Sequence, residues 1–174
     1  MRSRRQYKRR ALSGLTLAVA LFGVLATAAS AIPSHRLVWN ASASVPVGFY
    51  WRIADRPQRG DLVLAWAPLW ARRLAAERHY LPFDVPLAKR IAAVEDDTVC
   101  ADDDAILING ALVAHRLVFD RSGRLMPHWT GCETLGPGAF FLLMPDVPDS
   151  FDGRYFGTIQ RQDIIGRLVP LWTR

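Results

Sequence analysis

Residues 105–119 read AILINGALVAHRLVF and contain the clearest fold signal in the chain. Two apolar runs flank Asn109-Gly110, and both of these residues adopt positive φ angles more readily than most residues do. A two-residue turn of this kind joins neighbouring antiparallel strands, so the stretch predicts a β-hairpin. We therefore expect a β-rich domain, and further strand signals lie on both sides of the hairpin.

Short apolar runs next to turn residues occur at residues 60–66, 136–145 and 163–172, and each predicts a strand. One passage differs. Residues 68–82, PLWARRLAAERHYLP, have apolar residues at helical spacing between two prolines, which predicts a short surface helix inserted between strands. The three aspartates at 102–104 lack the spacing of a calcium loop and indicate a solvated turn. The fold class predicted from these patterns is mainly β.

The positive charge of the chain is concentrated at its N-terminus. The net charge is +6, from 22 Lys and Arg against 16 Asp and Glu, and six of the basic residues lie within residues 1–10. The basic and acidic residues of the remaining chain balance. A basic face for nucleic acid is therefore not expected on the folded part, and we predict no nucleic-acid partner.

Residues 11–32, ALSGLTLAVALFGVLATAASAI, contain no charged side chain. A helix of this length spans roughly 33 Å against a hydrocarbon core of roughly 30 Å, so it can anchor the chain in a membrane. The basic tail at 1–10 would stay in the cytoplasm, which places residues 33–174 on the other side. A cleaved signal peptide and a buried helix of a soluble protein are the alternatives. We prefer the anchor because a signal-peptide core is usually about 7–15 residues long.

Cys100 and Cys132 are separated by the predicted hairpin. The sequence has no CxxC pair and no histidine near these cysteines at zinc-ligand spacing. A disulfide is then the simplest use of the two thiols in an oxidising compartment. Two buried free thiols are the alternative, because cysteine also packs well as a small apolar residue.

Lys89 lies in a predicted strand and is the only lysine after Lys8. The two-residue period of a strand places it on one face with Leu87, Ile91 and Ala93. If that face is buried, desolvation lowers the pKa of the amine from about 10.4 towards the range of about 7–8 that suits a general base. On an exposed edge strand, the ammonium would instead extend into water.

Residues 40–51, NASASVPVGFYW, place the hydroxyls of Ser42 and Ser44 shortly after the apolar segment. A serine hydroxyl is a poor nucleophile unless a base takes its proton. None of the four histidines has a sequence context that favours this role, although a catalytic triad is assembled in space and not in sequence. Lys89 is therefore the base that the sequence favours.

Four segments together resemble the bacterial type I signal peptidase group, serine peptidase family S26. These segments are SVPVGFY (44–50), LAKRIAAVEDDTVC (87–100), INGALV (108–113) and DSFDGRYFGTI (149–159). The opening motif and the cysteine pair are similar to those of the TraF-type peptidases of conjugative transfer systems. The resemblance covers nearly the whole chain. It implies a signal-peptidase-like, β-rich catalytic domain with one N-terminal transmembrane helix.

The resemblance also implies roles for individual residues. Ser44 matches the nucleophile and Lys89 the general base of a Ser/Lys dyad. Ser42 is placed like a hydroxyl that lines the oxyanion hole, with an ordinary turn hydroxyl as the alternative. Asp152 and Arg154 match an ion pair that supports the lysine. The family implies no metal and no cofactor.

The function implied is that of a serine endopeptidase in the bacterial inner membrane, with its catalytic domain in the periplasm. Its substrate would be an exported precursor protein, a prepilin, which is either hydrolysed or cyclised. The alternative is a non-catalytic, membrane-tethered β-rich module that assembles a pilus or secretion complex. Two departures from the family pattern favour this alternative slightly. EDD (95–97) replaces Pro-Gly-Asp beside Lys89, and DGR (152–154) replaces Asp-Ser-Arg, which removes a hydroxyl that could bond the lysine.

Overall fold

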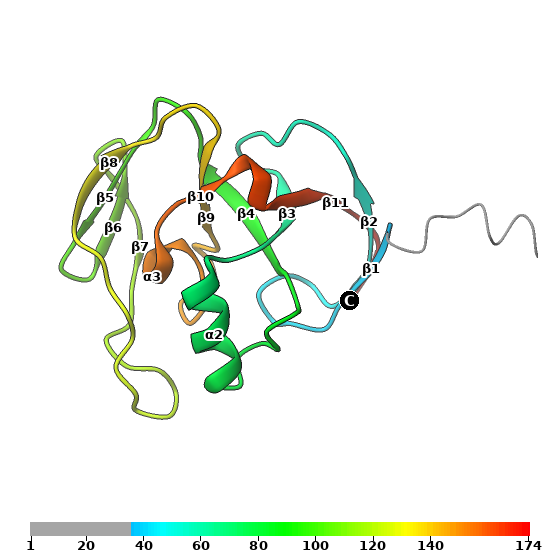
Figure 1. Ribbon diagram of the computed structural model, residues 1–174, viewed down its shortest axis with the longest axis horizontal. Helices are drawn as coiled ribbons and strands as arrows, with labels where there is room; N and C mark the ends of the chain where they lie inside the picture. Colours follow the sequence, from blue (N-terminus) through cyan, green and yellow to red (C-terminus); the bar gives the residue numbers. More distant parts are fainter. Residues whose placement is uncertain (1–35) are drawn as a thin grey trace, which may run out of the picture. The chain divides into compact units, whose positions relative to one another are not determined.

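The structure, a computed structural model, describes residues 36–174. Strands make up most of its regular structure, so the predicted mainly β fold class is confirmed (Figure 1). The elements are β1 (Leu37–Asn40), β2 (Gly48–Ile53), β3 (Leu62–Ala65), α2 (Leu69–Glu77), β4 (Leu87–Ala93), β5 (Thr98–Asp102), β6 (Ala105–Ile108), β7 (Ala111–His115), β8 (Gly131–Thr134), β9 (Ala139–Leu143), α3 (Gly153–Phe156), β10 (Ile159–Gln160), the 3-10 turn η1 (Arg161–Asp163) and β11 (Ile164–Thr173).

The strands form two antiparallel sheets. The larger sheet has the order β1-β2-β11-β3-β4-β9-β10, and the smaller one has the order β7-β6-β5-β8. In Figure 1 the smaller sheet lies at one end of the described domain, and α2 lies below the larger sheet. Strand β4 is interior to the larger sheet, between β3 and β9. Side chains on the covered face of β4 are therefore removed from water.

The hairpin predicted from Asn109-Gly110 is confirmed. Strands β6 and β7 pair with Ile108 opposite Ala111, which leaves Asn109 and Gly110 as the two loop residues. Their φ angles are 53° and 79°, the left-handed region that a type I′ turn requires. This local turn sets the pairing of β6 with β7 next to the loop.

The predicted helix is present but shorter than its sequence signal. It begins after Pro68 and ends at Glu77, and His79 has a φ of 60° that a continuing helix does not allow. Ala71 and Ala75 form its buried side, whereas Trp70 is exposed. Small residues at the contact let the helix approach the core closely. The residues after the helix carry the chain towards β4 and line the cavity described below.

The predicted disulfide joins Cys100 and Cys132, which lie opposite each other on β5 and β8. It closes a loop with a sequence separation of 32 residues. In the chain-entropy model this closure stabilises the fold by about 3–4 kcal/mol, because it restricts the unfolded chain.

We expect reduction of this disulfide to lower the free energy of unfolding by about 3–4 kcal/mol. The measurement is the urea midpoint of the full chain in detergent, with and without reductant. A variant with both cysteines changed to serine is the control, and reductant should not change its midpoint. An unchanged midpoint on reduction of the natural chain would contradict the prediction.

Within residues 36–174, the structure contains no helix long and apolar enough to cross a bilayer. The predicted anchor at 11–32 and the basic tail at 1–10 lie outside the described residues.

Candidate active site

Lys89 is buried, on the face of β4 that the strand pattern assigned to it. Along β4, Lys89, Ile91 and Ala93 are buried, whereas Arg90 is exposed on the opposite face. The side chain of Lys89 is only 3% exposed because β4 is an interior strand of the larger sheet. The alternative of an exposed edge-strand ammonium is therefore wrong.

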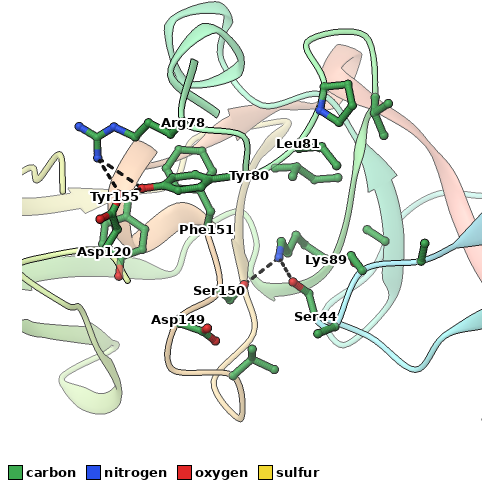
Figure 2. Close-up of a pocket in the computed structure, with 18 of the residues that line it drawn as sticks. Ser44, Arg78, Tyr80, Leu81, Lys89, Asp120, Asp149, Ser150, Phe151 and Tyr155 are labelled. Carbon is green, nitrogen blue, oxygen red and sulfur yellow. Dashed lines mark hydrogen bonds and ion pairs between the residues drawn. The ribbon is translucent and has the colours of Figure 1, made fainter. Parts of the chain in front are cut away.

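The amine of Lys89 lies between two serine hydroxyls. Its Nζ donates to Ser44 Oγ and to Ser150 Oγ, each at 2.7 Å. Figure 2 shows the three side chains converging from three parts of the chain: the loop between β1 and β2, strand β4, and the loop before α3. The sequence analysis paired Ser44 with Lys89, but it did not single out Ser150.

Burial lowers the pKa of the Lys89 amine from 10.5 to about 8. The negative charges of Asp152 and Asp149 act in the opposite direction and raise this pKa, while the positive charge of Arg154 lowers it. Desolvation is the largest of these effects. The amine is therefore poised to exchange a proton near neutral pH, which is the property that a general base needs.

Asn40 shapes the loop that presents Ser44. Its Nδ2 donates to the backbone carbonyls of Ser42, Val45 and Pro46 at 2.9–3.2 Å. The side chain of Asn40 is itself buried at the end of β1. A single amide thus ties both sides of the turn together, and the sequence analysis did not identify this role.

The Ser42 hydroxyl is engaged within the same loop. Its Oγ donates to Asn40 Oδ1 at 2.8 Å, and the Ser42 backbone N–H donates to the same oxygen at 3.2 Å. This is the contact expected of the alternative interpretation, an ordinary turn hydroxyl. The oxyanion role of Ser42 stays a prediction.

Asp152 and Arg154 form a fully buried ion pair, each with 0% exposure. Arg154 Nε donates to Asp152 Oδ1 at 2.8 Å, and Arg154 Nη2 donates to Asp152 Oδ2 at 3.2 Å. The guanidinium also donates to the backbone carbonyls of four residues: His115, Met144, Val147 and Pro148. Arg154 therefore fixes the loop after β9 that carries Ser150 to the lysine.

Close packing explains why residue 153, the middle residue of DGR, is glycine in this chain. A Cβ built on Gly153 would lie 2.7 Å from Leu142 O and 2.7 Å from a ring carbon of Phe141. A serine at this position would need the backbone of β9 to shift. Lys89 still has a second hydroxyl partner without a serine at position 153, because Ser150 provides one.

The EDD segment closes its turn without proline or glycine. Asp96 adopts a φ of 70°, a conformation that aspartate tolerates better than most residues do. The carboxylate of Asp97 accepts from Val94 N at 2.8 Å, and it also accepts from Asn109 Nδ2 and Arg59 Nη2. The end of β4 is thus held in place by Asp97 despite the departure from the family pattern.

Ser44 and Lys89 lie in one wall of a cavity of about 810 Å³. Aliphatic side chains such as Val38, Leu64 and Leu81 line much of it. A cavity of this size accommodates an extended segment of several residues. A hydroxyl within hydrogen-bond distance of a lysine with a lowered pKa can be activated as a nucleophile there.

The sequence of the chain matches a known protein family. The family model described as "Signal peptidase, peptidase S26" matches residues 9–172, so the chain belongs to this family. Family membership supports a peptidase-like role for the chain. The resemblance stated from the four sequence segments is therefore confirmed.

Two similar proteins refine this placement. The chain is 37% identical over 145 residues to the plasmid transfer protein TraF of Escherichia coli, covering 77% of this chain and 81% of that protein. It is 30% identical over 160 residues to the conjugal transfer protein TraF of Agrobacterium fabrum, covering 85% of this chain and 88% of that protein.

Among solved structures, a signal peptidase I from Enterococcus faecalis is 22% identical with a TM-score of 0.40, covering 67% of this chain and 100% of that one.

Proposed function

We propose that this chain is a membrane-anchored serine endopeptidase that uses Ser44 as nucleophile and Lys89 as general base. The observation that carries the proposal is the buried amine of Lys89, whose Nζ lies 2.7 Å from Ser44 Oγ. Ser150 accepts the second hydrogen bond of the amine and holds it in this position. Desolvation favours the uncharged form of the Lys89 amine, which can take a proton.

The reaction begins when Ser44 Oγ attacks a peptide carbonyl while Lys89 Nζ takes the hydroxyl proton. The tetrahedral intermediate then collapses, and the lysine delivers that proton to the leaving amine. The product is an ester between the acyl group and Ser44. A second nucleophile, either water or an amine of the substrate, releases the acyl group with Lys89 again acting as base.

The developing oxyanion needs hydrogen-bond donors. The backbone N–H of Ser44 and the hydroxyl of Ser42 are the donors that we propose. The Ser42 hydroxyl donates to Asn40 Oδ1 in the free protein, so its proton must rotate away from Asn40 when the transition state forms. Asn40 would then retain the backbone N–H of Ser42 as a donor to the same oxygen.

The proposed substrate is an exported precursor protein, specifically a prepilin of a conjugative transfer system. Two relatives that cover most of the chain are a plasmid transfer protein and a conjugal transfer protein, which supports this assignment. Attack on the acyl-enzyme by water would yield a linear product. Attack by the amino terminus of the same pilin would yield a ring.

We also propose that the peptidase domain faces the periplasm beside the inner membrane. Trp39, Phe49 and Trp172 occupy opposing positions on the neighbouring strands β1, β2 and β11, and all three are exposed. Aromatic side chains of this kind favour the membrane–water interface. Trp39 follows the proposed anchor at 11–32 closely in sequence.

The membrane assignment predicts that the full chain stays in the membrane fraction after alkaline extraction. Protease added outside spheroplasts should digest residues 33–174 and spare a cytoplasmic marker protein, because the basic tail stays inside. Release of the intact chain into the soluble fraction would contradict the anchor. Protection of the domain from protease would contradict the orientation.

The peptidase assignment predicts that Ser44→Ala lowers the rate of precursor processing by about 10³-fold or more, because the covalent route is lost. The measurement is mass spectrometry of a co-expressed prepilin, which also separates linear from cyclic product. Thr134→Ala on β8 is the matched control and should process normally. Full processing by the Ser44→Ala variant would leave the non-catalytic assembly module as the better description.

A further inference from the structure

The cavity that contains Ser44 has a second polar region, distinct from the lysine and its serines. Arg78, Tyr80, Asp120 and Arg124 all line the cavity, and we call these four residues the arginine cluster. Figure 2 shows the labelled members Arg78, Tyr80 and Asp120 together on the side of the cavity away from Ser44. The mechanism proposed above uses none of them.

The carboxylate of Asp120 is already satisfied within the cluster. Its Oδ1 accepts from the backbone N–H groups of Ser122 and Arg124, each at 2.9 Å. Its Oδ2 accepts from Arg124 Nε at 2.7 Å and from the hydroxyl of Tyr80. Four donors occupy the two oxygens, so Asp120 holds the cluster together and has little capacity for another donor.

The guanidinium of Arg78 makes fewer hydrogen bonds than the carboxylate of Asp120 does. Among residues 36–174, the side-chain hydrogen bonds of Arg78 involve Nη1 alone, at 3.4 Å to Tyr80 and 3.8 Å to the sulfur of Met126. Its separation from Asp120 Oδ2 is 3.8 Å, longer than a hydrogen bond. The side chain of Arg78 is 18% exposed, so its remaining donors have limited access to bulk water. Two arginines and one aspartate leave the cluster with one net positive charge.

Aromatic rings connect the arginine cluster to the serine–lysine site. Tyr80 lies 5.5 Å from Phe151 between ring centroids, and Phe151 follows Ser150 directly. The ring of Tyr155 stacks on that of Phe151, with 5.9 Å between centroids. Ser44, Phe151 and Arg78 line the same cavity, so a segment bound in it would have Ser44 and Arg78 along its walls. Apolar walls strengthen an ion pair formed there, because they reduce screening by water.

We propose that the arginine cluster is a substrate subsite that binds a carboxylate of the precursor while Ser44 acts on its backbone. Arg78, which lines the cavity, makes the direct contact through its guanidinium. Arg124 and Asp120 are positioning residues that hold Tyr80 and the 120–124 loop. The carboxylate has two sources, an acidic side chain or the C-terminus of the chain. This inference rests on the proposed peptidase function for the identity of the ligand as a peptide.

The test measures binding and needs no chemistry, so it is separable from the peptidase assignment. The probes are four acetylated peptides, Ala-Ala-Xaa-Ala, with Xaa as Glu or Gln and with the C-terminus either free or amidated. Their dissociation constants are measured by calorimetry on the full-length Ser44→Ala variant in detergent at pH 7. We expect at least one carboxylate peptide to bind about 10-fold or more tightly than the doubly neutral peptide.

The four peptides also separate the two sources of the carboxylate. A preference for Glu in the amidated pair assigns the subsite to an acidic side chain. A preference for the free terminus in the Gln pair assigns it to a chain end. Equal binding of all four peptides would overturn the proposal, whatever the outcome of the processing experiment with Ser44→Ala.

Variants at Arg78 show where the carboxylate binds. In the Ser44→Ala variant, a further Arg78→Gln substitution should reduce the preference for carboxylate peptides to about 2-fold or less. Arg78→Lys should keep part of this preference because the charge remains. Arg73→Gln is the matched control, on the helix that ends just before Arg78 but outside the lining of this cavity. Thermal unfolding of each variant verifies that it folds. A preference that survives in folded Arg78→Gln would overturn the proposal, because the carboxylate would then bind elsewhere, for example at Lys89.

Discussion

Replacing Lys89 with methionine is expected to slow precursor processing by about 10²- to 10⁴-fold, the usual contribution of a general base. Methionine has a similar length and fills the buried space on β4, but it cannot take the proton of Ser44. Arg90→Gln on the exposed face of the same strand is the matched control and should retain activity. Processing by Lys89→Met at the rate of the natural chain would exclude the lysine as base.

The natural chain should also show the protonation of Lys89 in its pH profile. With a pKa of about 8, roughly one amine in ten is uncharged at pH 7. The processing rate should therefore rise about tenfold per pH unit below that value and level off above it. Single-turnover rates between pH 5.5 and 9.5 test this expectation. A rate independent of pH over the whole range would be incompatible with an amine base of this pKa.

Lys89→Met should also make the folded state more stable at neutral pH. Burial lowers the pKa of Lys89 in the folded chain, while in the unfolded chain it keeps its ordinary value of 10.5. The unfolded chain thus binds the proton more tightly, and the folded state pays its full penalty below pH 8, about 3 kcal/mol at most. Lost hydrogen bonds to the two serines offset part of the gain. The stability difference between Lys89→Met and the natural chain should shrink as pH rises from 8 to 10.5.

The parts of the fold that sequence patterns predicted depend on short-range rules. The Asn109-Gly110 turn is defined by the φ preferences of two adjacent residues, and the structure has both angles in the expected region. The face that Lys89 shares with Ile91 and Ala93 follows from alternation along a single strand. The disulfide prediction required only two cysteines and the expectation of an oxidising compartment. Each of these inferences uses residues that act locally or in isolation.

The parts that sequence patterns missed depend on contacts between distant segments. Ser150 reaches Lys89 across 61 residues, and nothing in its neighbours marks it as a partner of the amine. The arginine cluster joins Arg78 to Asp120, which come from a helix end and a loop. Asn40 acts through backbone carbonyls, which every residue has, so its role has no sequence signature. Only the packed structure identifies these three.

The steric constraint at Gly153 also comes from a contact between segments that are distant in sequence. From the sequence, the glycine of DGR reads as the loss of a functional serine. In the structure, a Cβ at that position would collide with the backbone of Leu142 on β9. The distance between α3 and β9 therefore decides the residue, and that distance cannot be read from residues 152–154 alone.

The second large effect that we expect is on stability. Asp152→Asn should lower the free energy of unfolding by about 3–5 kcal/mol, because it leaves the buried guanidinium of Arg154 without its counter-charge. Domains of this size are usually stable by only about 5–15 kcal/mol, so the loss is a large fraction of the total. The measurement is the urea midpoint and slope of the full chain in detergent.

The matched control for this variant is the surface pair of Arg167 and Asp55, which has a similar separation of 2.7 Å. Asp55 is exposed and Arg167 is partly exposed, so Asp55→Asn should cost less than about 1 kcal/mol. Equal effects of the two substitutions would contradict a structural role for the buried pair. Loss of activity in Asp152→Asn without any loss of stability would instead assign Asp152 directly to the chemistry.

Arg154→Met should destabilise the chain more than Asp152→Asn does. The guanidinium donates to four backbone carbonyls in addition to Asp152, and methionine leaves all of these acceptors without that partner. Three of the four carbonyls belong to the segment leading to Ser150, so this loop should loosen first. Faster amide exchange at Ser150, whose N–H donates to Val147 O at 3.0 Å, is the expected local readout. Unchanged exchange there would mean that β9 and α3 hold the loop without Arg154.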